Sequence, residues 1–109
     1  LEFRKISNDE YEFKTEIQDY HINAGGVTHG GFIMSMLDSG MGTAAHQVIE
    51  GKAVTISLNT NFIGGSKAGD KIIGFAKIKK KTRSLIFMYG HLKCEDKLLA
   101  SAEGIWKII

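Results

Sequence analysis

The stretch NAGGVTHGG, residues 23–31, leads directly into an apolar run of helical period in which one acid, Asp38, interrupts the apolar residues. Glycines in front of a helix let the backbone approach a ligand closely, and the first helical N–H groups point outward at the positive end of the helix dipole. Gly30 and Gly31 therefore predict either a turn that polarises a carbonyl or holds an oxyanion, or simply a tight strand-to-helix turn.

Asp38 favours the functional interpretation. From residue 32 to about residue 50 the apolar residues recur at helical spacing, with Ile33, Leu37 and Met41 in one stripe. A rotation of about 100° per residue places Asp38 inside the apolar arc, too far into the helix to be its N-cap. A carboxylate on such a face is costly unless it has partners. We therefore predict a functional acid rather than one at the edge of the stripe that reaches solvent.

The spacing of Gly30 and Asp38 predicts an oligomer. Eight residues of helix separate them by roughly 12 Å along the axis, whereas a reacting atom must lie about 3 Å from both an oxyanion donor and a base. Two helices running antiparallel across a two-fold axis would bring Gly30 of one chain opposite Asp38 of the other. If the pair is catalytic, the protein is at least a dimer. Gly40 and Gly42, inside the helix, predict close approach of another backbone.

A family resemblance rests on these residues. Asn23 stands six residues before His29-Gly30-Gly31, and Asp38 stands nine residues after His29. This spacing resembles the motif of hotdog-fold acyl-coenzyme A (acyl-CoA) thioesterases, in the phenylacetyl-CoA thioesterase branch of the 4-hydroxybenzoyl-CoA thioesterase superfamily. Residues 54–62 (VTISLNTNF) are similar to the family's strand after the central helix. The likeness therefore covers nearly the whole chain.

The resemblance implies hydrolysis of acyl-CoA thioesters and a role for each motif residue. The N–H of Gly30 would polarise the thioester carbonyl, while Asp38 from the other subunit would activate water or attack directly. Thr55 would help to position the water. Asn23 would hold the substrate or the water, and His29 would orient the loop or contact the thioester.

The same resemblance implies how substrate and subunits are held. Gly31 and Phe62 would contact the substrate, and Lys81 and Arg83, at the end of a basic run, would lie near the coenzyme A phosphates. For most lysines of that run, a solvated strand end is the simpler interpretation. No cofactor is expected, because coenzyme A is part of the substrate. The expected assembly is a homo-oligomer, at least a dimer, with a dimer of dimers as the homotetramer.

The rest of the chain predicts a sheet. Residues 10–18 alternate between apolar and charged side chains, which is typical of a half-buried strand. Further strands are predicted at residues 53–63, 71–82, 84–94 and 97–107, with hairpin turns at 64–66, 81–83 and 95–97. This order predicts an α+β fold in one domain, residues 1–109: a long central helix wrapped by an antiparallel sheet of about five to six strands.

Composition argues against several classes of protein. With 109 residues, 43% of them hydrophobic, the chain is long enough for one core, and a net charge of +2 makes no case for nucleic acid binding. A single cysteine, Cys94, excludes an intrachain disulfide and fits a reducing compartment. There is no apolar run for a membrane span and no signal-peptide pattern, so we expect a cytoplasmic protein. The histidines lack a compact ligand pair, so no metal is expected.

Several alternatives stay open. A non-catalytic acyl-CoA-binding hotdog module and a hotdog dehydratase or hydratase are the competing functions, whereas a serine hydrolase is disfavoured because no Gly-x-Ser-x-Gly elbow is present. Asp38 could be a general base or a nucleophile. The acyl group could be aromatic or a short to medium chain. Phe32, Met34, Met41 and Phe62 could line its pocket or belong to the core.

Overall fold

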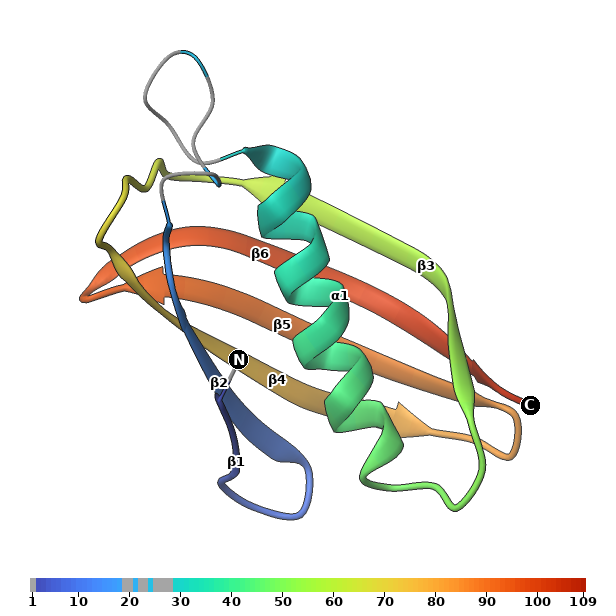
Figure 1. Cartoon of the computed structure of the whole chain (residues 1–109). Helices are drawn as coiled ribbons and strands as arrows, with labels where there is room; N and C mark the ends of the chain where they lie inside the picture. Colours follow the sequence, from blue (N-terminus) through green and yellow to red (C-terminus); the bar gives the residue numbers. More distant parts are fainter. Residues whose placement is uncertain (1, 19–20, 22–23, 25–28) are drawn as a thin grey trace.

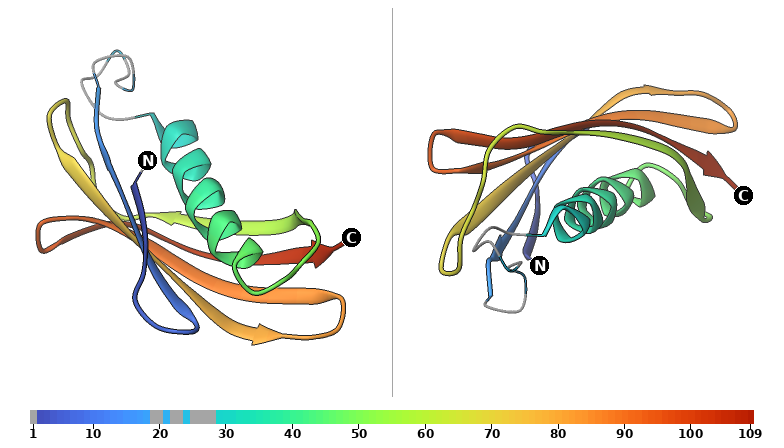
Figure 2. Two further views of the ribbon diagram at one scale, coloured as in Figure 1. Left: turned by 60° about the horizontal axis from the view of Figure 1, so that its bottom comes forward. Right: turned by 90° about the horizontal axis from the view of Figure 1, so that it is seen from above.

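The protein is one helix held in a curled antiparallel sheet, as seen in a computed structural model that describes residues 2–18, 21, 24 and 29–109. Its elements follow the order β1 (Glu2–Lys5), β2 (Glu10–Glu16), α1 (Gly30–His46), β3 (Ala53–Phe62), β4 (Lys71–Lys81), β5 (Leu85–Cys94) and β6 (Lys97–Ile108). The strands form a single sheet in the order β1-β2-β4-β5-β6-β3, which wraps around α1 (Figures 1 and 2). The predicted α+β architecture is confirmed.

The five predicted strands are present, each within two residues of its predicted bounds. Sequence analysis did not predict β1, because this strand has only four residues and a single apolar side chain, Phe3, to suggest alternation. Phe3 is half-buried and stacks on Tyr11, with ring centroids 5.4 Å apart. The stack attaches the short strand to the sheet.

The predicted helix end is wrong. Helix α1 ends at His46 rather than near residue 50, and Val48 and Ile49 pack against the core from a turn. The His46 ring stabilises this end, since Nδ1 lies 2.8 Å from the Gly42 carbonyl and Nε2 accepts the Ala53 N–H at 3.1 Å. The ring therefore joins the end of α1 to the first residue of β3. No helix in the described part of the chain is long and apolar enough to cross a membrane.

The predicted hairpin at residues 64–66 is also wrong. Strand β3 pairs with β6, not with β4, so the segment after Phe62 crosses from the sheet edge towards the middle of the sheet. The N–H groups of Ile63 and Gly64 both donate to the Leu99 carbonyl, at 2.8 and 2.9 Å. Glycine suits this crossing, because a Cβ at position 64 would lie 2.9 Å from the Leu98 carbonyl oxygen. The turn residues mark a break, but they do not specify which strands it joins.

The core lies between α1 and the concave face of the sheet. It contains the helix stripe and buried side chains of β2, β4, β5 and β6, among them Phe13, Leu37, Met41 and Trp106, all 2% exposed or less. The sequence suggested that Gly40 and Gly42 would face another backbone, but the neighbours that they meet within this chain are side chains. A Cβ at Gly40 would collide with the Phe13 ring, and one at Gly42 would lie 3.3 Å from the Trp106 indole nitrogen. Both glycines instead make room for aromatic rings of the chain's own sheet.

Candidate active site

Asp38 and Thr55 form the polar centre of a groove between α1 and the edge strand β3. The Thr55 hydroxyl donates to Asp38 Oδ1 at 2.7 Å, a short distance typical of a hydrogen bond to a carboxylate. The surrounding pocket has a volume of about 280 Å³ and is lined by Met34, Ser35, Asp38, Thr55 and Leu58. An acid, a hydroxyl and apolar walls therefore face one solvent-accessible space.

A β-bulge directs Thr55 towards the helix. Thr55 pairs with Trp106 and Ser57 pairs with Ile105, so Ile56 is the extra residue on β3. The side chains of Thr55 and Leu58, three residues apart, then face the same pocket, although strict alternation would put them on opposite faces. The bulge thus creates the Asp38–Thr55 contact, which a period of two along the strand does not predict.

Asp38 lies at the margin of the buried stripe rather than within the core. Its side chain is half-buried, whereas the preceding Leu37 is fully buried. Thr55 occupies Oδ1, and Oδ2 has no partner among the residues that the structure describes. One carboxylate oxygen is therefore fixed, while the other is left for a water molecule or a substrate atom.

The first turn of α1 presents free backbone donors. His29 precedes the helix, and its carbonyl accepts the N–H groups of Phe32 and Ile33 at 3.1 and 3.2 Å. Within the described part of the chain, no acceptor lies on the N–H of Gly30 or Gly31, and both glycines are exposed. A Cβ at Gly31 would meet no atom within 4 Å. The helix N-terminus is thus open to a ligand carbonyl.

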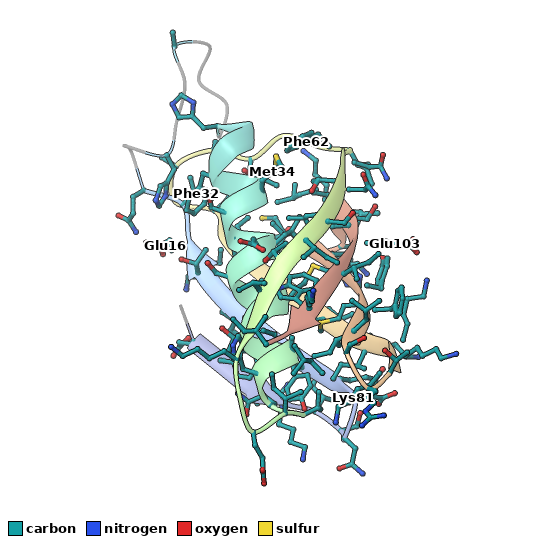
Figure 3. The ribbon with its side chains drawn as sticks, turned by 90° about the vertical axis from the view of Figure 1, so that its right-hand side faces the viewer. Glu16, Phe32, Met34, Phe62, Lys81 and Glu103 are labelled. Carbon is teal, nitrogen blue, oxygen red and sulfur yellow. The ribbon has the colours of Figure 1, made fainter. Side chains whose placement is uncertain are left out.

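Gly30 and Asp38 of one chain stay apart. Asp38 contacts Thr55, while Gly30 lies next to the ring of Phe62, which would be 3.5 Å from a Cβ at position 30. Because β3 runs antiparallel to α1, the pair Gly30 and Phe62 lies at the helix N-terminus, and the pair Asp38 and Thr55 lies further along the same groove. Phe62 and Met34 lie at its end, near the helix N-terminus (Figure 3). Both are apolar and exposed, by 56% and 38%.

Other predicted site residues lie elsewhere in the chain. Asn23 is outside the described residues. Lys81 and Arg83 lie at the turn between β4 and β5, at the end of the molecule away from Phe62 and Met34 (Figure 3). Within one chain they do not approach the helix N-terminus.

Two of the four candidate acyl-pocket residues lie outside the groove. Met41 is fully buried in the core. Phe32 lies on the side of α1 away from β3 (Figure 3), where its ring stacks on His21. Among the described residues, no three His, Cys, Asp or Glu side chains are placed to hold a metal ion.

Two residues near this groove were not singled out from the sequence. Thr60 pairs with the buried Ala102 on the helix-facing side of β3, between Leu58 and Phe62, and its buried Oγ1 has no hydrogen-bond partner among the described residues. His21 packs under the first turn of α1. Alternation along β3 would have indicated Thr60 only after the bulge was known, and no sequence signal marked His21 as part of this turn.

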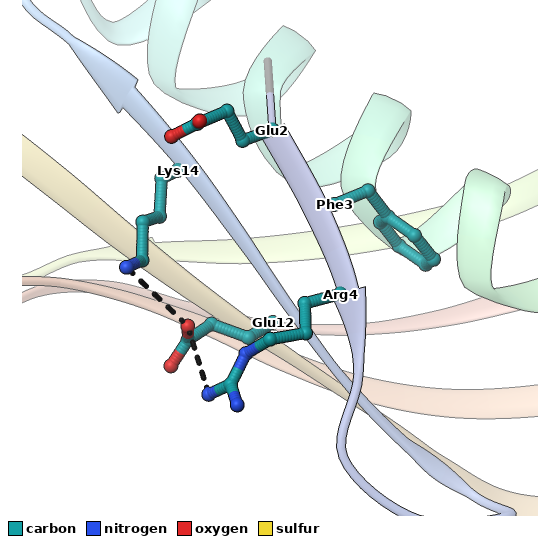
Figure 4. Close-up of a pocket in the computed structure, with 5 residues that line it drawn as sticks. All are labelled: Glu2, Phe3, Arg4, Glu12 and Lys14. Atoms are coloured by element: carbon teal, nitrogen blue, oxygen red, sulfur yellow. Dashed lines mark hydrogen bonds and ion pairs between the residues drawn. The ribbon is translucent and has the colours of Figure 1, made fainter.

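A second pocket, of about 290 Å³, lies at the opposite edge of the sheet (Figure 4). It is lined by Glu2, Phe3, Arg4, Glu12 and Lys14. Arg4 and Lys14 lie 3.2 and 3.8 Å from one Glu12 oxygen. Exposed ion pairs of this kind contribute little to stability and mark a solvated strand edge rather than a reaction site.

Comparisons with known proteins agree with this arrangement. The family model described as the thioesterase superfamily matches residues 25–101. A Pseudomonas aeruginosa protein whose name suggests an esterase is 30% identical over 94 residues, which cover 84% of this chain and 70% of that protein.

Solved structures show the same fold. A phenylacetic acid degradation-related protein from Ralstonia eutropha superposes with a TM-score of 0.92 at 24% identity, covering 97% of this chain and 83% of that one. For the phenylacetic acid degradation protein PaaI of Thermus thermophilus the TM-score is 0.90 at 22% identity, covering 99% and 92% of the two chains. The family match spans more than half of the sequence, and the chain therefore belongs to the thioesterase superfamily, as a thioester hydrolase with the hotdog fold.

Proposed function

We propose that this protein hydrolyses acyl-CoA thioesters at a site shared by two chains. The observation that carries the proposal is the 2.7 Å hydrogen bond from Thr55 to Asp38, in a pocket beside a free sheet edge. The Asp38 carboxylate supplies a base or nucleophile, and the exposed N–H of Gly30 supplies an electrophile for the carbonyl oxygen. Because these two groups lie at different levels of one groove, a second chain is needed to bring them together.

The free edge of β3 supports pairing with a second copy. None of its ten residues is charged, and Val54 and Ile56 are 44% and 54% exposed. A long, uncharged edge strand is a template for pairing with another chain. An antiparallel β3–β3 pair with a two-fold axis near the middle of the strand, at Leu58 or Asn59, would bring the Thr55 end of one strand beside the Phe62 end of the partner subunit's strand. Asp38 of one chain would then face Gly30 of the other.

Each site residue has a defined task in this dimer. The Gly30 N–H, with Gly31 beside it, hydrogen-bonds the carbonyl oxygen as it gains charge, a contribution of about 3 kcal/mol when the donor is preorganised. Asp38 either takes a proton from water or attacks the carbonyl to form an anhydride. Thr55 fixes the carboxylate. For Asn23 and His29 we retain the roles implied by the resemblance, in holding the substrate and orienting the turn.

The same two-fold axis gives Lys81 and Arg83 a task. Leu85, just after the β4–β5 turn, pairs with Lys107, which also pairs with Val54 near the start of β3. Since antiparallel pairing puts the start of one β3 beside the end of the other, this basic turn approaches Gly30 of the partner subunit. We propose that Lys81 and Arg83 bind the phosphates of coenzyme A there.

Met34 and Phe62 are the proposed apolar contacts of the acyl group. Their exposed side chains lie together at the helix N-terminus, next to Gly30. The names of the structural neighbours make arylacetyl groups the first to test, with short- to medium-chain acyl groups alongside. We further propose that dimers associate into a homotetramer, as the family resemblance implies.

The test is thiol release from a panel of aryl, arylacetyl and fatty acyl-CoA thioesters, with Asp38→Asn as the matched variant. Burial raises the pKa of the Cys94 thiol, so this side chain will react slowly with the thiol reagent. We expect the wild-type protein to release thiol from at least one thioester of the panel. In Asp38→Asn we expect kcat for that thioester to fall about 10²- to 10⁴-fold, with the oligomer unchanged in light scattering. Binding of coenzyme A without thiol release would instead favour a non-catalytic acyl-CoA-binding module. Hydration or dehydration of enoyl or hydroxyacyl thioesters would favour the hydratase alternative.

A further inference from the structure

We propose that His21 is a positioning residue that fixes the direction of the Gly30 N–H. The inference rests on the proposed function, because it concerns the group that would polarise the thioester carbonyl. His21 makes three contacts in this part of the chain. Its backbone carbonyl binds His29, its ring stacks on Phe32 in α1, and its ring nitrogen binds Gln18 just beyond β2. Together these contacts determine how the peptide before Gly30 is oriented.

The first contact is a backbone hydrogen bond. The N–H of His29 donates to the His21 carbonyl at 2.7 Å. The His29 carbonyl, in the next peptide, accepts the N–H groups of Phe32 and Ile33. This carbonyl and the Gly30 N–H belong to one planar trans peptide, so they point in opposite directions. Fixing both peptides that flank His29 therefore fixes where the Gly30 N–H points.

The other two contacts are made by the ring of His21. It stacks on Phe32, in the first turn of α1, with centroids 3.7 Å apart and an interplanar angle of 17°. Its Nδ1 accepts the N–H of Gln18, just beyond β2, at 2.9 Å. The carbonyl that holds His29 thus belongs to a residue tied to both β2 and α1. The His21 N–H also donates to the Gln18 carbonyl at 2.9 Å, so removal of the ring would leave this carbonyl tied to Gln18 but no longer tied to α1. The His29 peptide would then lose its fixed position relative to the helix.

His21 acts through this turn rather than on the substrate. Phe32, its stacking partner, lies on the side of α1 away from Met34 and Phe62 (Figure 3). The imidazole therefore supports the helix N-terminus from behind the groove. Its removal should weaken stabilisation of the transition state while leaving the contacts that bind coenzyme A and the acyl group in place.

The experiment compares His21→Ala, which removes the ring, with His21→Asn, whose amide oxygen can still accept the Gln18 N–H. His91→Ala is the matched control, because His91 also stacks on a phenylalanine, Phe75, but on the other face of the sheet. We expect His21→Ala to lower kcat about tenfold to a hundredfold, with KM changed less than about twofold. His21→Asn should recover part of the loss, and His91→Ala should keep wild-type kcat.

A spectroscopic signature separates positioning from a loss of stability. In the Asp38→Asn background, which holds the thioester intact, isotope-edited infrared spectra report the stretch of the bound carbonyl. We expect a frequency below that of free thioester, shifted back towards the free value by His21→Ala. A folded, dimeric His21→Ala protein with unchanged kcat and carbonyl frequency would overturn the proposal.

The two proposals fail in different ways. If Asp38→Asn abolishes thiol release while both His21 variants keep wild-type kcat, the proposed function stands and the role of His21 is rejected. If no thioester in the panel releases thiol even with the wild-type protein, the proposed function fails and the role of His21 fails with it. If His21→Ala does not fold, the kcat of His21→Asn decides, because a wild-type value with an unchanged carbonyl frequency rejects the role.

Discussion

The two free edges of the sheet differ in length, charge and apolar exposure. Strand β1 has four residues, of which Glu2, Arg4 and Lys5 are charged, and Arg4 pairs across the edge with Glu12. Strand β3 has ten residues without a charge, and Val54 and Ile56 expose apolar side chains. Natural sheets use short, charged edges to prevent association. The short, charged edge at β1 therefore disfavours pairing with another strand, whereas the long, uncharged edge at β3 favours it.

The reactive groups lie beside the uncharged edge. Thr55 of β3 is hydrogen-bonded to Asp38, and Phe62 at the end of the same strand lies next to Gly30. The pocket at the β1 edge is lined by the partly buried Phe3 and by four charged side chains, three of which form ion pairs. In the proposed function, association and chemistry are therefore combined at β3, where a partner chain would complete the site.

The largest expected effect on activity comes from making the edge of β3 charged, as β1 is. The double change Val54→Lys and Ile56→Lys puts two charged side chains on the exposed apolar part of this edge, which disfavours pairing with a second strand. We expect a folded monomer by light scattering and a fall in thiol release of at least about a hundredfold, since the oxyanion donor is lost from the site. Glu2→Lys at an exposed position of β1 changes the net charge by the same amount and is the control, which should leave the oligomer intact. A monomer with wild-type activity would contradict the account.

A smaller effect is expected from Thr55→Val, which keeps the shape of the side chain but removes its hydroxyl. The Asp38 carboxylate would lose its 2.7 Å donor and its fixed orientation. We expect kcat to fall about tenfold with little change in the thermal midpoint, because the pair is partly exposed. Steady-state kinetics and a melting curve measure both effects. Wild-type kcat in this variant would show that the hydrogen bond has no role in turnover.

The smallest effect on stability is expected at Thr60. Within the part of the chain that the structure describes, its buried Oγ1 has no hydrogen-bond partner. Thr60→Val therefore removes an unsatisfied hydroxyl and should leave the free energy of unfolding unchanged or raise it by about 1 kcal/mol. Chemical denaturation of the dimer at a fixed concentration measures this difference. A clear destabilisation would mean that the hydroxyl finds a partner in the assembled protein.

Much of the fold followed from local pattern, because single elements determine it. The helical stripe through Leu37 and the alternation around Phe13 depend only on which residues share a face. Strand β1 was missed, since three of its four residues are charged. The crossing after Phe62 was mistaken for a hairpin, because strand pairing is a long-range property that glycines do not encode.

The candidate site was predictable only in part. The spacing of His29, Gly30 and Asp38 indicated the helix N-terminus and the acid, and the structure places both on the groove. The contact between Asp38 and Thr55 depends on the extra residue Ile56, which no local signal marks as a bulge. His21 contributes through contacts with Gln18 and Phe32 that fold back along the chain. Such contacts become visible only in three dimensions.

The most direct test of the shared site mixes two inactive variants. Gly30→Pro removes the N–H with little backbone strain, because proline suits the first position of a helix and His29, at φ −57° and ψ 131°, already has the extended conformation that precedes proline. Its Cβ would lie 3.5 Å from the Phe62 ring, an ordinary van der Waals contact. Asp38→Asn removes the carboxylate. In a heterodimer of the two, one site would combine the intact Gly30 of one chain with the intact Asp38 of the other, while the second site would carry both changes.

Thiol release after the two variants are unfolded and refolded together in equal amounts is the measurement. The account predicts that the mixture regains about a quarter of the wild-type activity, since half of randomly formed dimers would be mixed and each would hold one intact site. The separately refolded variants would stay inactive. A mixture that contains heterodimers but remains as inactive as its components would show that each chain forms its own site, and would contradict the account.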